Sequence, residues 1–143
     1  MATDRKAEVV WQGDLMNGSG TITNVTSGAF GPLDVSWPSR AEEPNGKTSP
    51  EELIASAWAA CYSMALSHGL AQAGTPAEKL ETSATVTFQP GEGITRGALT
   101  VRATIPGIDD AAFQEAARGA KENCPVSKAL AGIPEVTLDA ALA

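Results

Sequence analysis

The pattern of residues 49–74 predicts one long helix that is apolar on nearly all of its sides. Ser49 is a favourable N-cap, Pro50 suits the first helical position, and Glu52 completes an S-x-x-E capping box. Gly74 supplies a stop signal. A helix that is apolar all round is a buried one, and its many alanines favour a second backbone packed closely against it. The apolar positions are Leu53, Ile54, Ala57, Trp58, Ala60, Cys61, Met64 and Ala65.

The rest of the chain shows strand patterns on both sides of this helix, with two further helices near the end. Strands are expected over residues 7–12, 20–26, 33–37, 80–89, 95–105 and 135–140. Asp109 and Asp110 can cap an amphipathic helix, and a short helix starts near Cys124. The order βββ-α-ββ-αα-β is typical of an α+β domain, so we predict a single domain over residues 1–143.

The charge balance restricts the classes of partner. Seventeen Asp and Glu residues against ten Lys and Arg residues give a net charge of −7, which disfavours nucleic acids and anionic membranes. The first six residues lack the apolar core of a signal peptide, and the apolar run over residues 53–66 is short for a membrane span. We therefore expect a cytoplasmic protein with neither nucleic acid nor membrane as its partner.

Two cysteines, Cys61 in the long helix and Cys124 at the start of the short one, are the residues with the clearest chemical potential. The chain has no CxxC motif and a single histidine, which excludes zinc-binding and thioredoxin-like interpretations. A permanent disulfide is rare in a reducing compartment. The alternatives are two inert buried thiols or a pair that meets in the fold and performs redox chemistry, and residue types alone leave both open.

Redox chemistry at Cys61 would require a thiolate, because the thiol is a poor nucleophile. At an ordinary pKa only about 3% of the side chain is ionised at pH 7, and lowering the pKa to about 6 needs roughly 3.4 kcal/mol. Burial acts in the opposite direction, so a cation is required. His68 lies about 10 Å further along the helix, which makes Arg40 the candidate. Cys124, as an N-cap before Pro125, has free N–H groups that favour an anion.

Plainer interpretations exist for each of these residues. A cysteine among alanines in the middle of a helix is typical of packing. Glu51 at a helix start supports the capping box and the helix dipole, and Arg40 can be a solvated charge. His68 is expected to be a helix-face residue without a catalytic part.

Two motifs resemble the OsmC branch of the OsmC/Ohr family. The first is the Pro-Glu-Glu-Leu helix start with a cysteine ten positions after the first glutamate, matched by Glu51 and Cys61. The second is the Cys-Pro-Val-Ser segment of residues 124–127. Residues 11–14 and 135–139 are also similar to this branch, so the resemblance extends over nearly the whole chain.

The resemblance implies a thiol-dependent peroxidase that reduces organic hydroperoxides. The implied fold has antiparallel sheets around a long buried helix and forms an intertwined homodimer. Carried onto this sequence, Cys61 becomes the peroxidatic residue and Cys124 the resolving one, while Arg40 and Glu51 polarise and orient the thiolate site. No metal or organic cofactor is implied, and the reductant is an external dithiol, for which the family suggests a lipoylated protein or a small dithiol.

Helix geometry adds one expectation about the assembly. Glu51 and Cys61 lie about 15 Å apart along the axis of a continuous helix, which one glutamate side chain cannot span. A contribution of Glu51 to the Cys61 site must then come from the second subunit. Apolar neighbours of Cys61, namely Trp58, Met64 and Leu66, favour organic hydroperoxides over hydrogen peroxide.

Two other functions are alternatives to the peroxidase. The stronger alternative is a non-catalytic dimer on the same fold that binds an apolar small molecule. A cysteine hydrolase is disfavoured, because His68 is the only histidine and is badly placed.

Overall fold

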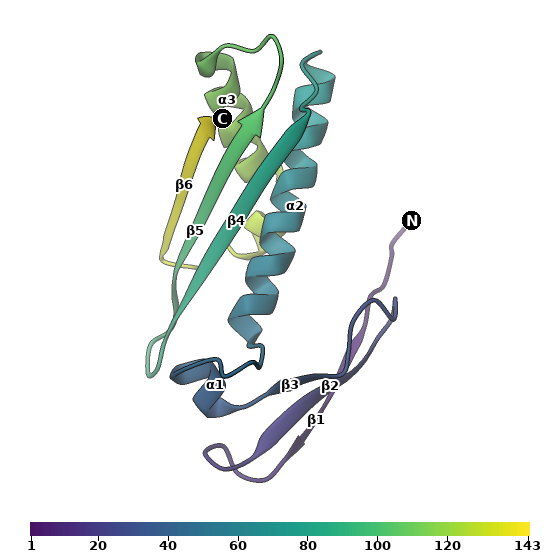
Figure 1. The fold of residues 1–143 in the computed structure, drawn as a ribbon, viewed down its shortest axis with the longest axis vertical. Coiled ribbons are helices and arrows are strands. Elements are labelled where there is room, and N and C mark those ends of the chain that lie inside the picture. The colour runs from purple at the N-terminus through teal and green to yellow at the C-terminus, as the bar shows by residue number, and fades with distance from the viewer. The chain divides into compact units, whose positions relative to one another are not determined.

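The computed structural model describes residues 1–143, which form six strands and four helices (Figure 1). In chain order the elements are β1 (Ala7–Gln12), β2 (Ser19–Val25), β3 (Leu33–Val35), α1 (Trp37–Ala41), α2 (Pro50–Gln72), β4 (Lys79–Gln89), β5 (Gly93–Thr104), α3 (Asp110–Asn123), α4 (Pro125–Ala129) and β6 (Glu135–Leu142). The predicted α+β class is confirmed. The contacts divide the chain into two compact parts, Met1–Leu53 and Ile54–Ala143, which are described in turn. The single domain expected over residues 1–143 stays a prediction.

The first part is built on an antiparallel sheet with the strand order β1-β2-β3. Trp11 of β1 faces Gly20 of β2, which in turn faces Val35 of β3. A Cβ atom at Gly20 would lie 2.7 Å from the Trp11 ring and 2.9 Å from the Val35 side chain. Glycine at this position therefore lets the indole lie across the middle strand.

The strand expected over residues 33–37 is shorter than predicted, because residues 37–41 form the helix α1. Ser36 caps this helix by accepting a hydrogen bond from the Ser39 N–H at 3.2 Å, and Pro38 suits its first turn. The signal was present in the sequence as a serine before a proline, but a five-residue helix leaves too short a periodic pattern to detect. Arg40 consequently lies in the last turn of a helix and not at the end of a strand.

Helix α2 starts and ends where the sequence predicts. Ser49 Oγ accepts from the Glu52 N–H at 3.1 Å, whereas the Glu52 carboxylate accepts from the Thr48 hydroxyl at 2.8 Å. At the other end Gly74 adopts a φ of +82°, and the Thr75 N–H donates to the Leu70 carbonyl.

The second part contains a sheet with the order β4-β5-β6. Strands β4 and β5 form a long antiparallel hairpin, but β6 pairs with β5 in parallel. The expectation of purely antiparallel sheets is therefore wrong. The reason is topological: α3 and α4 form a crossover that returns the chain to the starting end of β5, and a crossover of this kind joins parallel strands.

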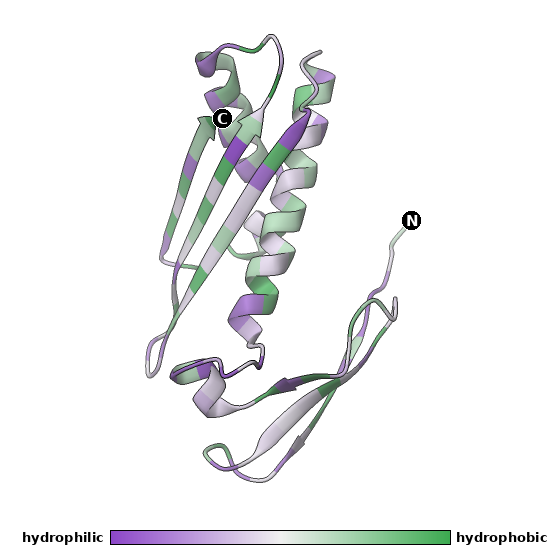
Figure 2. Cartoon of the chain, viewed as in Figure 1, coloured by the Kyte–Doolittle hydropathy of each residue, from purple (hydrophilic) through white to green (hydrophobic).

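Helices α2 and α3 pack on one face of this sheet. Leu99, Val101 and Ala103 alternate along β5 and point to the same face, where they join buried residues of both helices in one core. Figure 2 shows the corresponding alternation of hydrophobic and hydrophilic bands along the sheet strands. The core residues from the helices include Trp58, Tyr62, Leu66, Leu70, Phe113 and Ala117.

Within one chain α2 is buried on one face only. Trp58, Tyr62, Leu66 and Leu70 recur every four residues and are fully buried, whereas Met64 is 72% exposed. The sequence predicts burial all round because apolar residues occupy the opposite face as well. That complete burial is not present in a single chain.

Candidate active site

The structure brings the two cysteines together. Cys61 lies in the middle of α2 and Cys124 lies between α3 and α4, and their sulfur atoms are 3.0 Å apart. Both are free thiols, with Cys124 fully buried and Cys61 partly exposed. The crossover after β5 achieves this, because it brings Cys124 back against the helix that carries Cys61. The two sulfurs need to approach by only about 1 Å to form a disulfide.

Cys124 is the N-cap of α4, as the sequence predicts. Its Sγ accepts a hydrogen bond from the Ser127 N–H at 3.5 Å, and Pro125 opens the helix. The Ser127 hydroxyl in turn accepts a hydrogen bond from the indole N–H of Trp58 at 2.8 Å. The sequence predicted Trp58 as an apolar neighbour of Cys61 and Ser127 as part of the Cys-Pro-Val-Ser motif, but not the hydrogen bond between them. The available signal was the position of Ser127, three residues after an N-cap, but its pairing with Trp58 depends on long-range packing.

The surroundings of the two sulfurs act differently on their acidity. Burial raises the pKa of Cys61, and its hydrogen bond with Cys124 raises it further. Burial also acts to raise the pKa of Cys124, but hydrogen bonds from Cys61 and from Ser127 outweigh it and lower the pKa. Within one chain the pair therefore holds a thiolate more readily on Cys124. Ionisation of Cys61 therefore needs a nearby cation, as the sequence predicts.

Arg40 and Glu51 form a bidentate ion pair within the first part of the chain. Arg40 Nε lies 3.0 and 3.2 Å from the two carboxylate oxygens of Glu51, and Nη2 lies 2.8 Å from Oε2. The Glu51 side chain is 7% exposed and that of Arg40 is 31% exposed. Hydrogen bonding to Glu51 raises the pKa of the guanidinium, which stays charged. The carboxylate thus fixes the plane of the guanidinium while part of that group remains open to solvent.

Cys61 opens onto a groove between α2 and α3 with a volume of about 890 Å³. Small and apolar side chains dominate its walls, and His68 and Glu115 are its titratable residues besides Cys61. Met64 lines this groove as the sequence suggested, but Trp58 and Leu66 do not, because both are buried in the core. The groove gives a small apolar molecule access to the Cys61 sulfur. The other lining residues are Ala65, Gly69, Ala73, Ala112, Ala116, Gly119, Ala120, Asn123 and Pro125.

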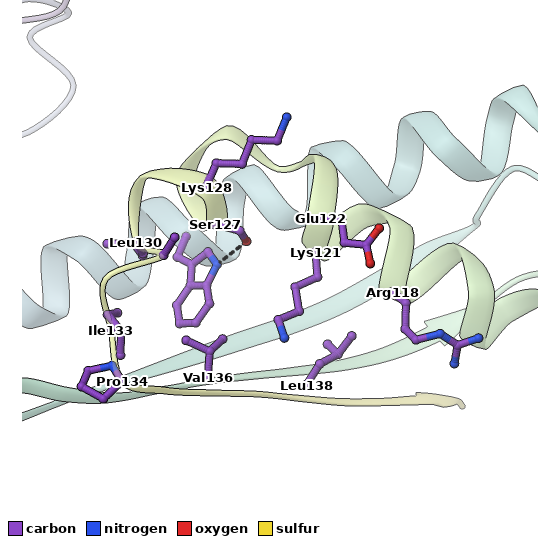
Figure 3. Close-up of a pocket in the computed structure, with 12 residues that line it drawn as sticks. Arg118, Lys121, Glu122, Ser127, Lys128, Leu130, Ile133, Pro134, Val136 and Leu138 are labelled. Atoms are coloured by element: carbon purple, nitrogen blue, oxygen red, sulfur yellow. Dashed lines mark hydrogen bonds between the residues drawn. The ribbon is translucent and has the colours of Figure 1, made fainter.

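Trp58 instead forms part of a second pocket, of about 640 Å³, between α3, α4 and β6. Figure 3 shows Ser127 at this pocket with the dashed hydrogen bond to the indole, and Val136 and Leu138 of β6 below it. Arg118, Lys121 and Lys128 also line the pocket.

The sequence matches the family model described as "OsmC-like protein" over residues 43–139. The chain belongs to this family. It is 39% identical to peroxiredoxin OsmC of Escherichia coli, over 97% of this chain and 96% of that relative. It is 32% identical to the organic hydroperoxide resistance protein OhrA of Bacillus subtilis, over 76% of this chain and 79% of that protein. The predicted family is confirmed.

The fold of this OsmC-like chain agrees with a solved structure. The organic hydroperoxide resistance protein OsmC of Legionella pneumophila is similar with a TM-score of 0.71 and 26% identity, covering 95% of this chain and 96% of that one. Among the helices described here none has the length and hydrophobicity to cross a membrane. No three or more His, Cys, Asp or Glu side chains are grouped so that they could hold a metal ion.

Proposed function

We propose that this protein is a cysteine-based peroxidase that reduces organic hydroperoxides through Cys61 and Cys124. The observation that carries the proposal is the pair of free thiols 3.0 Å apart, one reached from an apolar groove and the other fully buried. Membership in the OsmC-like family and relatives named for peroxide reduction support the general activity.

The exposed sulfur attacks the peroxide in this scheme. The Cys61 thiolate attacks one oxygen of ROOH, the O–O bond breaks, and the alkoxide leaves as ROH after taking a proton. Cys61 becomes a sulfenic acid. The Cys124 sulfur then attacks the Cys61 sulfur, the S–O bond breaks, and water leaves as the disulfide forms. The short distance between the sulfurs makes the second step fast and protects Cys61 from further oxidation.

Arg40 supplies the cation that Cys61 requires, and Glu51 holds it in place. The guanidinium stabilises the thiolate and the charge that develops on the leaving oxygen. Glu51 and Cys61 are ten residues apart in α2, about 15 Å along its axis, so the pair reaches the Cys61 of a second subunit. This separation supports the proposal of an obligatory homodimer.

An external dithiol completes the cycle by reducing the disulfide. A lipoylated protein or a small dithiol fits this step, and no metal or organic cofactor takes part. The apolar walls of the groove, Met64 among them, favour organic hydroperoxides over hydrogen peroxide. The expected compartment is the cytoplasm.

The decisive experiment is the intact mass of the reduced protein before and after one equivalent of cumene hydroperoxide. Disulfide formation removes two hydrogens, a loss of about two mass units. Cys61→Ser should abolish turnover. Cys124→Ser should allow one turnover to the Cys61 sulfenic acid, and a second equivalent of hydroperoxide should then convert it to the sulfinic acid, a total gain of about 32 mass units.

An unchanged mass with both thiols still titratable would contradict the peroxidase. The same fold would then serve as a non-catalytic dimer that binds an apolar small molecule, and the groove at Cys61 is its binding site.

A further inference from the structure

Ser127 makes a hydrogen bond with Trp58 through its hydroxyl and with the Cys124 sulfur through its backbone N–H. The indole ring is fully buried and lies against Gly97 of β5, where a Cβ atom would come within 2.7 Å of the ring. Only a glycine permits this packing. The ring position is thereby fixed, and with it the direction of its N–H toward Ser127 on α4.

The donor and acceptor rules decide how the hydroxyl of Ser127 is used. An indole N–H can only donate, so the Ser127 oxygen must accept at the 2.8 Å contact with Trp58. The hydroxyl proton then remains for another acceptor. The Cys124 sulfur is the candidate acceptor, because it already accepts the Ser127 N–H at 3.5 Å. The Ser127 hydroxyl also acts to lower the pKa of Cys124.

We propose that Ser127 is a catalytic residue for reduction of the Cys61–Cys124 disulfide, donating its hydroxyl proton in a hydrogen bond to the departing Cys124 sulfur, with Trp58 as its positioning residue. This proposal rests on the proposed peroxidase cycle and identifies the group that acts in its recycling step. Peroxide reduction itself does not use the hydrogen bond between Trp58 and Ser127, and the recycling step gives that bond a role.

The exposure of the two sulfurs sets the direction of the recycling step. Cys61 borders the groove, whereas Cys124 is fully buried, so an incoming thiolate reaches the Cys61 sulfur. The new S–S bond forms at Cys61, the old one breaks, and its electron pair goes to Cys124. The second thiol of the dithiol then attacks its own sulfur in the mixed disulfide and releases Cys61, which leaves the dithiol oxidised and the protein reduced.

A leaving thiol of lower pKa departs faster in such an exchange. The groups that act on Cys124 are Cys61, the N–H groups of Val126 and Ser127, and the Ser127 hydroxyl, which together lower its pKa against the effect of burial. Tyr62 is also near Cys124: burial, and then Cys124, raises the pKa of its phenol, which stays neutral. Arg118, Lys121, Glu122 and Lys128 line the pocket beside Ser127, and none of them is changed in the variants below. The Ser127 hydroxyl is thus a contributor that can be removed by mutation without changing charge.

The first test measures the pH at which the Cys124 thiol ionises in a Cys61→Ala background. The absorbance of the thiolate at 240 nm reports the titration. Adding Ser127→Ala should raise the midpoint by about one pH unit, whereas Ser127→Thr, which keeps the hydroxyl, should restore it. Trp58→Phe keeps a buried ring but removes the N–H, and should raise the midpoint in the same direction. Ser63→Ala is the matched control, because the Ser63 hydroxyl bonds Ala59 and Thr82 and touches neither cysteine.

The second test uses the disulfide form of the protein with dithiothreitol as the probe. Ser127→Ala should slow reduction by about threefold to tenfold, and Ser127→Thr should not. An unchanged midpoint and rate in Ser127→Ala would overturn the proposal, and an unchanged Trp58→Phe would remove Trp58 from it. The titration involves no peroxide, so its outcome is separate from the mass experiment on peroxidase activity.

Discussion

Arg40 presents two nitrogens to Glu51 in a planar fork, and this geometry is what a guanidinium offers beyond its charge. A lysine at the same position would keep the charge but could not keep the second nitrogen in place. The sequence predicted that these two residues act together only through the family resemblance. The contact itself depends on α1, the helix that the sequence did not reveal.

Arg40→Lys tests whether geometry or charge matters at this position. We expect the second-order rate constant with cumene hydroperoxide to fall by about 100-fold or more in Arg40→Gln, and substantially in Arg40→Lys, because the oriented donor is lost in both. Stopped-flow measurement of peroxide consumption gives the rate constants. Arg102→Lys is the control, since Arg102 makes a similar two-nitrogen contact with Asp139 on an exposed surface. A wild-type rate in Arg40→Lys would show that charge alone suffices.

At the scale of the elements, β5 and α2 meet at Gly97 and Trp58. A methyl group on Gly97 would overlap two atoms of the indole ring, at 2.7 and 2.8 Å, and a fully buried ring has no space to withdraw. We expect Gly97→Ala to lower the free energy of unfolding by about 1–3 kcal/mol. Urea denaturation at one fixed protein concentration measures this change.

Gly132→Ala serves as the matched substitution for Gly97→Ala. Gly132 lies in an exposed loop with no atom near the added methyl group, so its effect should stay within about 0.5 kcal/mol. Equal stabilities of the two variants would mean that Trp58 is not held against β5.

Local signals explain which elements the sequence could predict. The bounds of α2 follow from Ser49, Pro50 and Gly74, whose effects act within one helical turn. The parallel pairing of β6 has no such local signal, because its partner strand lies beyond two intervening helices. The same holds for the Trp58–Ser127 contact, which joins residues of distant elements. Residue types left the meeting of the two cysteines open, and only the family resemblance predicted it.

At the scale of the whole molecule, both parts of the chain leave apolar side chains uncovered. Val10 and Trp11 of β1 are 53% and 40% exposed, and Met64 on the outer face of α2 is 72% exposed. We expect the proposed homodimer to cover such side chains, and α2 would then be buried on all sides only in the assembly.

The proposed dimer predicts that Arg40 acts on the Cys61 of the other subunit. An experiment that mixes two inactive variants can test this. Cys61→Ser lacks the peroxidatic sulfur and Arg40→Gln lacks the cation, so each homodimer should be inactive. If Arg40 serves the Cys61 of the other subunit, a mixed dimer contains one intact site, with Cys61 from one chain and Arg40 from its partner. When equal amounts of the two proteins exchange subunits at random, half of the dimers are mixed, and each has one of its two sites intact. The mixture should then have about a quarter of the wild-type activity.

The control for this experiment mixes Cys61→Ser with Glu51→Gln and should give a similar recovery, because Glu51 travels on the same chain as Arg40. A mixture of Arg40→Gln with Glu51→Gln should recover far less, since no site then receives the intact ion pair. If the Cys61→Ser and Arg40→Gln proteins exchange subunits, as shown by native mass spectrometry, and remain inactive, Arg40 must act within its own chain. The distance of about 15 Å along α2 between Glu51 and its own Cys61 would then not keep the Arg40–Glu51 pair from that cysteine.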